Sequence, residues 1–284
     1  MKNSMSFILF LIFTFSLNSA WAYKNKNQPV QVMSYNIRMN TQADGENAWP
    51  LRKDKVIGLF SFYQPDLFGI QEGLPEQVAD LVAGLPDFDH IGVGRDDGRS
   101  SGEHMCIFYR KSRFQKLDYG TFWFNEATDK PGIGWDAACN RTCTWVRLKD
   151  LDTKKVFYYF NTHLDHRGQV ARRESANLLL KKMKEINHEN LPFILTGDFN
   201  AVKENEPIRI ILKELKDSRT ICKTTPYGPD GTSGGFEIKP FTRIIDYVFV
   251  NDKANVLRHA ILTDSNGKYF HSDHLAVFAE ILLN

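Results

Sequence analysis

The sequence predicts an α/β protein, a four-layer sandwich in which two mainly antiparallel β-sheets pack face to face with helices outside. Three observations support this prediction. Short runs rich in β-branched and aromatic residues recur along the chain, amphipathic helical patterns lie between some of them, and no linker, repeat or change of composition divides residues 29–284. Because 42% of the 284 residues are hydrophobic, the chain can bury a large core, and we expect one domain.

The first residues are typical of an export signal. Lys2 precedes an apolar run over residues 7–13, and the small residues Ala20 and Ala22 fit a signal-peptidase site. The apolar run is short for a bilayer-spanning helix, which needs roughly 20 residues, so an uncleaved anchor is the less favoured alternative. We predict a signal peptide over residues 1–22 with cleavage after Ala22, then a short lead over residues 23–28. A secreted or periplasmic location and no transmembrane segment in the mature chain follow.

The predicted strands are short and bounded by polar or turn-forming residues. They cover residues 30–37, 66–71, 105–110, 114–124, 142–148, 156–163, 192–196, 244–250 and 275–283. Helical patterns cover residues 51–63, 75–83, 170–186 and 207–215. In the third helix Ala176, Leu179, Met183 and Ile186 share one face, so this helix should cover a sheet. Residues 224–240 are rich in Gly, Pro and Ser, which predicts a long loop near the functional site.

Charge and cysteine content limit the possible functions. The formal net charge is +2, and a nearly neutral chain lacks the many Lys and Arg contacts on which non-specific nucleic-acid binding depends. The four cysteines are Cys106, Cys139, Cys143 and Cys222. Export would permit disulfides, and the spacing of Cys139 and Cys143 lacks the second pair of ligands that a structural zinc site needs. A local disulfide and free core thiols both remain open.

Polar side chains suited to a metal and a phosphate recur where predicted strands begin or end. In the segment Gly-Asp-Phe-Asn at residues 197–200, Asp198 and Asn200 should share a cleft while Phe199 enters the core. The other positions are Asn36, Glu72, His163, Asp246 and the pair Asp273 and His274. Each alone would be an ordinary turn former, cap or surface residue. Six strand ends with the same chemistry indicate a shared site.

This set of side chains predicts metal-assisted attack of water on phosphorus. Mg²⁺ prefers oxygen ligands and keeps several waters, so one or two carboxylates and an amide suffice to bind it. A histidine beside the metal can donate a hydrogen bond to a phosphate, and a carboxylate partner keeps that histidine positively charged. We expect Mg²⁺ as cofactor, with Mn²⁺ or Ca²⁺ as alternatives.

Six short segments, in this order, resemble the motifs of the endonuclease/exonuclease/phosphatase superfamily. They are Ser34-Tyr35-Asn36, Gln71-Glu72, Asn161-Thr162-His163, Gly197-Asp198-Phe199-Asn200, Ile245-Asp246-Tyr247 and Ser272-Asp273-His274. This superfamily includes pancreatic-type deoxyribonucleases, abasic-site endonucleases, sphingomyelinases, inositol-polyphosphate phosphatases and deadenylases. The resemblance runs from about residue 30 to the C-terminus and implies a metal-dependent hydrolase of phosphoric esters.

The resemblance also implies a role for each candidate residue near the metal. Glu72 would be the principal metal ligand, with Asn36 and Asp273 beside the metal. Asp198 would orient or deprotonate the attacking water, and Asn200 would help to hold the phosphate.

Two histidines are expected to face the phosphate. His274 would contact a phosphoryl oxygen while Asp246 accepts its other N–H and keeps the imidazole protonated. His163 matches a second phosphate-facing histidine, which the deoxyribonuclease branch pairs with a glutamate. Glu103 occupies the matching place, so we expect a second histidine–carboxylate pair, with an exposed charge at a strand start as the alternative for Glu103.

Three further residues are candidates for substrate binding. The segments at residues 134–138 (Gly-Trp-Asp-Ala-Ala), 144–145 (Thr-Trp) and 163–168 (His-Leu-Asp-His-Arg-Gly) resemble a group of secreted bacterial members of the superfamily. They bring in Trp135 and His166. Arg141 falls where the deoxyribonuclease branch carries a phosphate-contacting arginine, and its planar guanidinium suits phosphate. The alternatives are a surface charge for Arg141 and a buried core position for Trp135.

Departures from the family patterns narrow the substrate. Leu74 stands where deoxyribonucleases carry an arginine for the DNA minor groove, which disfavours duplex DNA. Residues 243–247 lack the Trp-Cys-Asp-Arg run of the inositol phosphatases, and no exposed aromatic hairpin marks a membrane-binding sphingomyelinase. The favoured function is a secreted phosphodiesterase or phosphatase acting on a small phosphoester, with a sugar or lipid headgroup preferred. A secreted nuclease cleaving DNA or RNA and a non-catalytic module that binds phosphate ligands are the alternatives.

Overall fold

The structure of the protein, a computed structural model, describes residues 28–284. The predicted signal peptide and residues 23–27 of the predicted lead lie outside the described residues. The strands are β1 (Val30–Asn36), β2 (Leu67–Gln71), β3 (Phe88–Ile91), β4 (Ile107–Arg110), β5 (Phe114–Trp123), β6 (Thr142–Asp150), β7 (Val156–His163), β8 (Phe193–Asp198), β9 (Lys216–Asp217), β10 (Asp246–Val250), β11 (Ala254–Ile261) and β12 (Val277–Leu283). The helices are η1 (Gln42–Asn47), α2 (Trp49–Tyr63), α3 (Pro75–Gly84), α4 (Gln169–Ile186), α5 (Glu206–Ile211) and α6 (Ser218–Ile221). Within residues 28–284, no helix has both the length and the apolar character required to cross a membrane.

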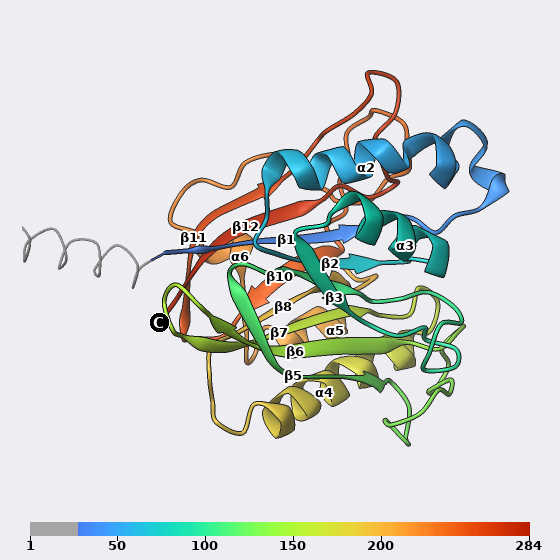
Figure 1. Ribbon diagram of the computed structural model, residues 1–284. Coiled ribbons are helices and arrows are strands. Elements are labelled where there is room, and N and C mark those ends of the chain that lie inside the picture. The colour runs from blue at the N-terminus through green and yellow to red at the C-terminus, as the bar shows by residue number, and fades with distance from the viewer. Residues whose placement is uncertain (1–27) are drawn as a thin grey trace, which may run out of the picture.

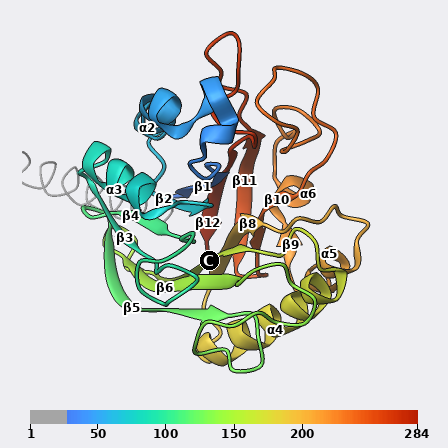
Figure 2. The ribbon, with the colours of Figure 1, turned by 90° about the vertical axis from the view of Figure 1, so that its right-hand side faces the viewer.

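Two six-stranded sheets form the centre of the molecule (Figures 1 and 2). The first sheet has the strand order β11-β12-β1-β2-β4-β3, and the second has the order β5-β6-β7-β8-β10-β9. Helices α2 and α3 cover the outer face of the first sheet, and α4 and α5 cover the outer face of the second (Figure 1). The predicted four-layer α/β sandwich with mainly antiparallel sheets is confirmed.

The two sheets share one pattern of strand pairing. In each sheet a central parallel pair, β1 with β2 or β7 with β8, is flanked on both sides by antiparallel strands. Parallel strands end at the same edge of a sheet. Asn36 is therefore in register with Gln71 at the end of the first pair, and His163 with Asp198 at the end of the second. Each sheet thus presents polar side chains at one edge.

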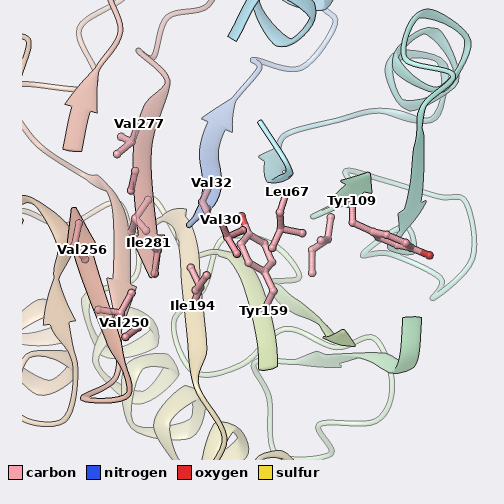
Figure 3. Close-up of a cluster of buried hydrophobic side chains, with 14 of the residues drawn as sticks. Val30, Val32, Leu67, Tyr109, Tyr159, Ile194, Val250, Val256, Val277 and Ile281 are labelled. Atoms are coloured by element: carbon pink, nitrogen blue, oxygen red, sulfur yellow. The ribbon is translucent and has the colours of Figure 1, made fainter. Parts of the chain in front are cut away.

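The inner faces of the two sheets pack against each other through an apolar layer. Val32 and Leu67 of the first sheet belong to the same buried cluster as Tyr159 and Ile194 of the second sheet (Figure 3). Two further clusters lie between the sheets and the outer helices. The predicted apolar face of residues 170–186 is confirmed, because its four residues all pack in the cluster beneath α4. This packing keeps both sheets fixed relative to their helices.

One buried amide joins the central strand pairs of the two sheets. Asn161 of β7 makes four hydrogen bonds of 2.7 to 3.1 Å. Its partners are the carbonyl oxygens of Ile70 and Cys106 and the side chains of Gln71 and Thr196. On the facing strand, a Cβ atom at Gly69 would lie 2.4 Å from the Asn161 side chain, so only glycine fits there. The polar edges of the two sheets are therefore held in a fixed relation.

Several element boundaries differ from those that the sequence predicts. The last strand begins at Val277, so Asp273 and His274 lie in the preceding loop and do not open the strand. The reason is that the carbonyl oxygen of Asp273 accepts hydrogen bonds from Gly234 and Gly235, at 3.2 Å each, in place of a neighbouring strand. These glycines belong to the long loop expected at residues 224–240, which does lie next to the candidate site. Five further elements are not predicted by the sequence patterns: β3, β9, β11, η1 and α6.

The cysteines settle one open alternative. All four are free, and Cys106 and Cys143 are fully buried core thiols. Cys139 is partly buried and lies 3.8 Å from the Oδ2 atom of Asp165. The local disulfide between Cys139 and Cys143 is not formed because β6 directs Cys143 into the apolar cluster beneath α4.

Candidate active site

Asp198 lies at the centre of a group of polar side chains contributed by both sheets. It ends β8 and is almost fully buried. Its Oδ1 atom accepts a hydrogen bond from the backbone N–H of Asn200 at 2.8 Å, and its Oδ2 atom accepts one from Nδ2 of Asn36 at 3.1 Å. The Nε2 atoms of His163 and His274 lie 3.4 and 3.8 Å from the same Oδ2. Burial raises the pKa of Asp198 to about 7, which suits a proton acceptor at neutral pH.

His274 is held by a second carboxylate. Its Nδ1 atom lies 2.9 Å from Oδ2 of Asp246, the first residue of β10, which faces Asp198 in the antiparallel register. Burial opposes a positive charge on His274, but the carboxylates of Asp246 and Asp198 outweigh it and raise the pKa of His274 well above the usual range. Ser233, from the long loop, contacts the Nε2 atom at 3.4 Å. His274 is thus a buried cation beside Asp198.

His163 has the opposite charge state. Its Nε2 atom lies 3.0 Å from Nδ2 of Asn200. Burial and the positive charges of Arg141 and Arg95 lower the pKa of His163 well below the usual range, so the ring is neutral. The carboxylate of Glu103 does lie near this ring, but its Oε2 atom is 3.9 Å from Nδ1 of His163, too far for a hydrogen bond, and 2.6 Å from Nη1 of Arg95. Arg95, to which the sequence analysis gave no role, takes the carboxylate.

Glu72 and Asp273 form an acidic corner next to this group. Glu72 follows β2 with a φ of 63°, a left-handed conformation that is uncommon outside glycine. Its two carboxylate oxygens accept hydrogen bonds of 3.0 Å from Nδ2 of Asn36 and from the backbone N–H of Met39. Burial opposes ionisation of Glu72, but the hydrogen bond from Asn36 and the nearby positive charges outweigh it and lower the pKa of Glu72. The Nη1 atom of Arg38 lies 3.9 Å from Oδ2 of Asp273.

The chemistry of this corner fits a hard divalent cation. Burial and the negative charge of Glu72 raise the pKa of Asp273, so two carboxylates lie close enough to repel each other. A cation bound by oxygen ligands would remove that repulsion. The side-chain oxygen of Asn36 accepts the backbone N–H of Arg38 at 3.0 Å, while its nitrogen faces Glu72 and Asp198. In this geometry Asn36 positions the two carboxylates and lies beside the cation that Glu72 and Asp273 would hold.

Arg52 fastens the acidic corner without reaching the reacting groups. It is a buried residue of α2 whose guanidinium, within residues 28–284, donates hydrogen bonds of 2.5 to 3.2 Å to backbone carbonyl groups and to no side chain. Their oxygens belong to Ile37, Arg38, Asn47 and His271. The end of β1 and the loop that carries Asp273 are therefore joined through one side chain. This role of Arg52 could not be predicted from the sequence, because a charged residue in a helix is ordinarily solvated.

Arg141 and His166 form a neighbouring cationic group. Arg141 is buried; its Nε atom contacts Oδ2 of Asp165 at 3.3 Å and its Nη2 atom contacts Nδ1 of His166 at 2.8 Å. Its Nη1 atom is buried and has no hydrogen-bond partner among the described residues. Cys139, Asp165 and His166 place potential ligand atoms within 4.8 Å of one another, but the guanidinium among them disfavours a metal cation. An anion such as phosphate would satisfy the unpaired N–H group.

The structure thus brings most of the predicted residues together. Those in direct contact around Asp198 are Asn36, His163, Asn200 and His274, with Asp246 behind His274 and Glu72 behind Asn36. Arg141 acts on His163 through its charge, and Glu103 is separated from His163 by its pairing with Arg95. Trp135 is not a core residue: it is 44% exposed on the loop before Arg141. His166 is exposed to solvent at the edge of the site.

The chain is similar to proteins of known family and structure. The family described as the Endonuclease/Exonuclease/phosphatase family matches residues 33–274. A protein of that family from Bacteroides thetaiotaomicron is 37% identical, with a TM-score of 0.88 over 91% of this chain and 99% of that chain. A mannosyl-6-phosphatase from Bacteroides thetaiotaomicron is 38% identical, with a TM-score of 0.85 over 89% of this chain and 99% of that chain.

A more distant structure shares the fold. The human Nocturnin catalytic domain, solved with a bound sulfate anion, is 20% identical and has a TM-score of 0.73 over 90% of this chain and 94% of that chain. The matched residues 33–274 include Asn36, Glu72, Asp198 and His274, which are the residues that build the site from both sheets. The chain belongs to the endonuclease/exonuclease/phosphatase family.

Proposed function

We propose that the protein is an exported, divalent-metal-dependent hydrolase of phosphoric esters whose substrate is a small phosphorylated molecule, with a sugar phosphate favoured. The observation that carries the proposal is the position of Asp198. It joins an acidic corner through Asn36 and lies between one charged and one neutral histidine. Export rests on the pattern of residues 1–22 alone.

The residues divide the proposed reaction among them. Glu72 and Asp273 would hold the cation, which when bound supplies positive charge that polarises a phosphoryl oxygen. Asp198, with a pKa of about 7, accepts the proton of the attacking water as the water oxygen bonds to phosphorus and the P–O bond to the ester group breaks. The released alkoxide takes a proton from solvent and leaves as an alcohol. The protonated His274 donates its Nε2–H to a phosphoryl oxygen, and Asp246 maintains its charge and orientation.

Three further groups would bind the phosphate. Nδ2 of Asn200 already faces the carbonyl oxygen of Leu164 and the ring of His163, so the amide and the neutral ring lie side by side at the site. The unpaired Nη1 of Arg141 is a further donor of suitable chemistry. Nδ2 of Asn200 would exchange one of its two present partners for a phosphoryl oxygen, and these groups together would stabilise the negative charge that grows as the water adds.

Two findings favour a sugar phosphate. The mannosyl-6-phosphatase from Bacteroides thetaiotaomicron is 38% identical over 89% of this chain. The chain is nearly neutral and carries Leu74 where a minor-groove arginine would favour duplex DNA. A nuclease and a non-catalytic binding module remain the alternatives that the experiment must separate.

The proposal is tested with a panel of phosphoesters in Mg²⁺ or Mn²⁺. The panel contains hexose phosphates, glycerol 3-phosphate, chromogenic mono- and diesters, plasmid DNA and RNA. We expect turnover of a small ester, lost on chelation and reduced on the order of 10³-fold in Glu72→Ala. Glu185→Ala is the matched control, because Glu185 lies on the exposed face of α4 and pairs only with lysines there.

The outcomes separate the alternatives. Activity that persists in chelator or in Glu72→Ala would exclude metal-dependent hydrolysis at this site. Cleavage of plasmid or RNA without turnover of small esters would favour the nuclease. Binding of phosphate ligands with no turnover across the panel would favour the binding module. Export is tested separately by sequencing the N-terminus of the protein recovered from the periplasm or the medium, which we expect to begin at Tyr23.

A further inference from the structure

Trp135 is displayed at the surface in an unfavourable backbone conformation. Its φ is 53°, in the left-handed region that bulky residues rarely adopt. Its side chain is 44% exposed, next to Ile133 in the chain, which is 61% exposed. Val170, at the start of α4, is also exposed. A tryptophan held in this way at the surface is unusual for a side chain whose only role is packing.

The turn that carries Trp135 is fastened on both sides. The carboxylate of Asp136 accepts hydrogen bonds from the backbone N–H groups of Val170 at 3.3 Å and Ala171 at 2.6 Å, in the first turn of α4. On the other side, a Cβ atom at Gly134 would lie 2.1 Å from the carbonyl oxygen of Phe124, so the backbone is closely packed there. The strained conformation is therefore imposed by the fold and fixes where the indole stands.

The same loop leads directly to Arg141, the proposed phosphate-binding cation. Oδ2 of Asp165 accepts from the backbone N–H of Ala138 at 3.1 Å and lies 3.3 Å from Nε of Arg141. Asp165 follows His163 by two residues, and the charge of Arg141 lowers the pKa of His163. One buried carboxylate thus fixes the turn with Trp135, the arginine and the end of β7 relative to one another.

A cavity of about 330 Å³ lies at this turn. Its lining includes Trp135 and Ile133, which are apolar, and Glu126 and Lys130, which carry opposite charges. This volume is at the lower end of the range for small-molecule sites, roughly 300 Å³, and suits a single ring. An aromatic face beside one acid and one base suits a neutral ring with many hydroxyl groups, whereas Glu126 disfavours a second phosphate.

We propose that Trp135 and this cavity bind the sugar ring of a phosphorylated sugar, and that Trp135 is a specificity-determining residue. The inference rests on the proposed function, because it places the phosphate of the same molecule at Arg141 and the catalytic group. The apolar face of the pyranose packs on the indole, and its hydroxyl groups hydrogen-bond to Glu126 and Lys130. Binding energy from this remote ring selects sugar phosphates over phosphoesters that lack a ring.

The test compares two substrates in four proteins: wild type, Trp135→Ala, Trp135→Gly and Phe62→Ala. The substrates are mannose 6-phosphate and glycerol 3-phosphate, which lacks a ring. We expect both Trp135 variants to lower kcat/KM for mannose 6-phosphate roughly tenfold, mainly through KM, and to change it less than about twofold for glycerol 3-phosphate. Glycine relieves the backbone strain, so Trp135→Gly should melt no lower than wild type. Phe62, 78% exposed on α2, is the control aromatic residue and should change neither substrate.

The results that would overturn the proposal are specific. An equal loss of kcat/KM for both substrates, or no loss for either, excludes Trp135 as a binding surface for the sugar ring. If wild type hydrolyses no phosphoester, the proposed function fails. Binding of the sugar ring at Trp135 is then tested separately by the indole N–H signal of Trp135 in NMR spectra. A saturable shift of that signal on addition of mannose 6-phosphate supports sugar binding at Trp135, and an unchanged signal refutes it.

Discussion

Replacing Asn161 by alanine should loosen the junction of the two sheets and cost about 3 kcal/mol of the free energy of unfolding. The substitution removes four buried hydrogen bonds, each with a net contribution of about 1 kcal/mol. The full sum is not expected, because some partners keep a second bond. Gln71 retains Ser34 at 3.3 Å, and Thr196 retains Phe160 at 3.3 Å. The small cavity left by the amide adds to the loss.

Denaturation in urea, followed by circular dichroism, measures this change. Asn177→Ala is the matched control, because Asn177 is exposed on α4 and makes one hydrogen bond of 3.3 Å to Glu174; its change should stay within about 0.5 kcal/mol. Gly69→Ala should cost about 1–3 kcal/mol, since its methyl group would displace Asn161. The double variant should lose less than the sum, because both changes break one network. A loss below about 1 kcal/mol in Asn161→Ala would refute the view that this amide holds the sheets together.

Three further predictions concern charge. Arg52→Met should destabilise the protein by about 2–4 kcal/mol and weaken activation by Mg²⁺, whereas Arg173→Met on α4 should do neither; unchanged Mg²⁺ activation in Arg52→Met would contradict a positioning role. Burial lowers the pKa of His259 from 6.5 to about 3. Its contribution to stability is therefore complete above pH 6.5 and is lost as the pH falls towards 3, by up to about 1.4 kcal/mol per pH unit. Urea titrations at several pH values should show a smaller dependence of the free energy of unfolding on pH in His259→Gln than in wild type. Asp246→Asn should lower the pKa of His274 and move the alkaline limb of the pH–rate profile to lower pH, and an unmoved limb would exclude His274 as the charged donor.

The general plan of the fold and of the site could be predicted because both depend on local patterns. Buried strands read as apolar runs, and polar residues at their ends stand out against them. Once strands lie in parallel pairs, Asn36 and the residues after β2 must share one edge, as must His163 and Asp198. The order of these short segments along the chain was sufficient to indicate their common site.

Partners that are distant in sequence could not be predicted. Arg52 lies 219 residues from His271, whose carbonyl oxygen it binds, and no local pattern distinguishes it from a solvated arginine. The pairing of Glu103 was missed for a related reason. The backbone N–H of Arg95 donates to the carbonyl oxygen of Glu103 at 3.0 Å, so the intervening loop folds back and places the guanidinium on the carboxylate. The sequence shows the two residues but not the turn that joins them.

Strand β11 was missed because its pattern is irregular. Polar residues interrupt the run, and the register with β12 shifts between Val256 and Arg258. His259 is nevertheless buried, where its Nδ1 atom contacts Oγ of Ser218 at 2.8 Å. A hydrogen bond to a residue distant in the sequence allows this histidine to be buried, and no local pattern shows it. A bulge also interrupts the alternation of polar and apolar residues by which a strand is otherwise recognised.

The repeated pairing pattern places the centre of the site at the junction between the edges of the two sheets, which we call the seam. The first sheet and its loops carry the acidic corner and His274, the second carries Asp198, His163 and Asp246, and the 3.1 Å contact from Asn36 to Asp198 spans the seam. If one sheet slid along the other by a single residue, about 3.3 Å, the site residues of the first sheet would move away from those of the second. The hydrogen bonds inside each sheet would stay intact. The shared apolar layer and the hydrogen bonds of Asn161 oppose such a slide and keep the seam aligned. Tolerance to substitution should be lowest along it, and an agent that wedged the sheets apart would stop turnover in a protein that still appears folded.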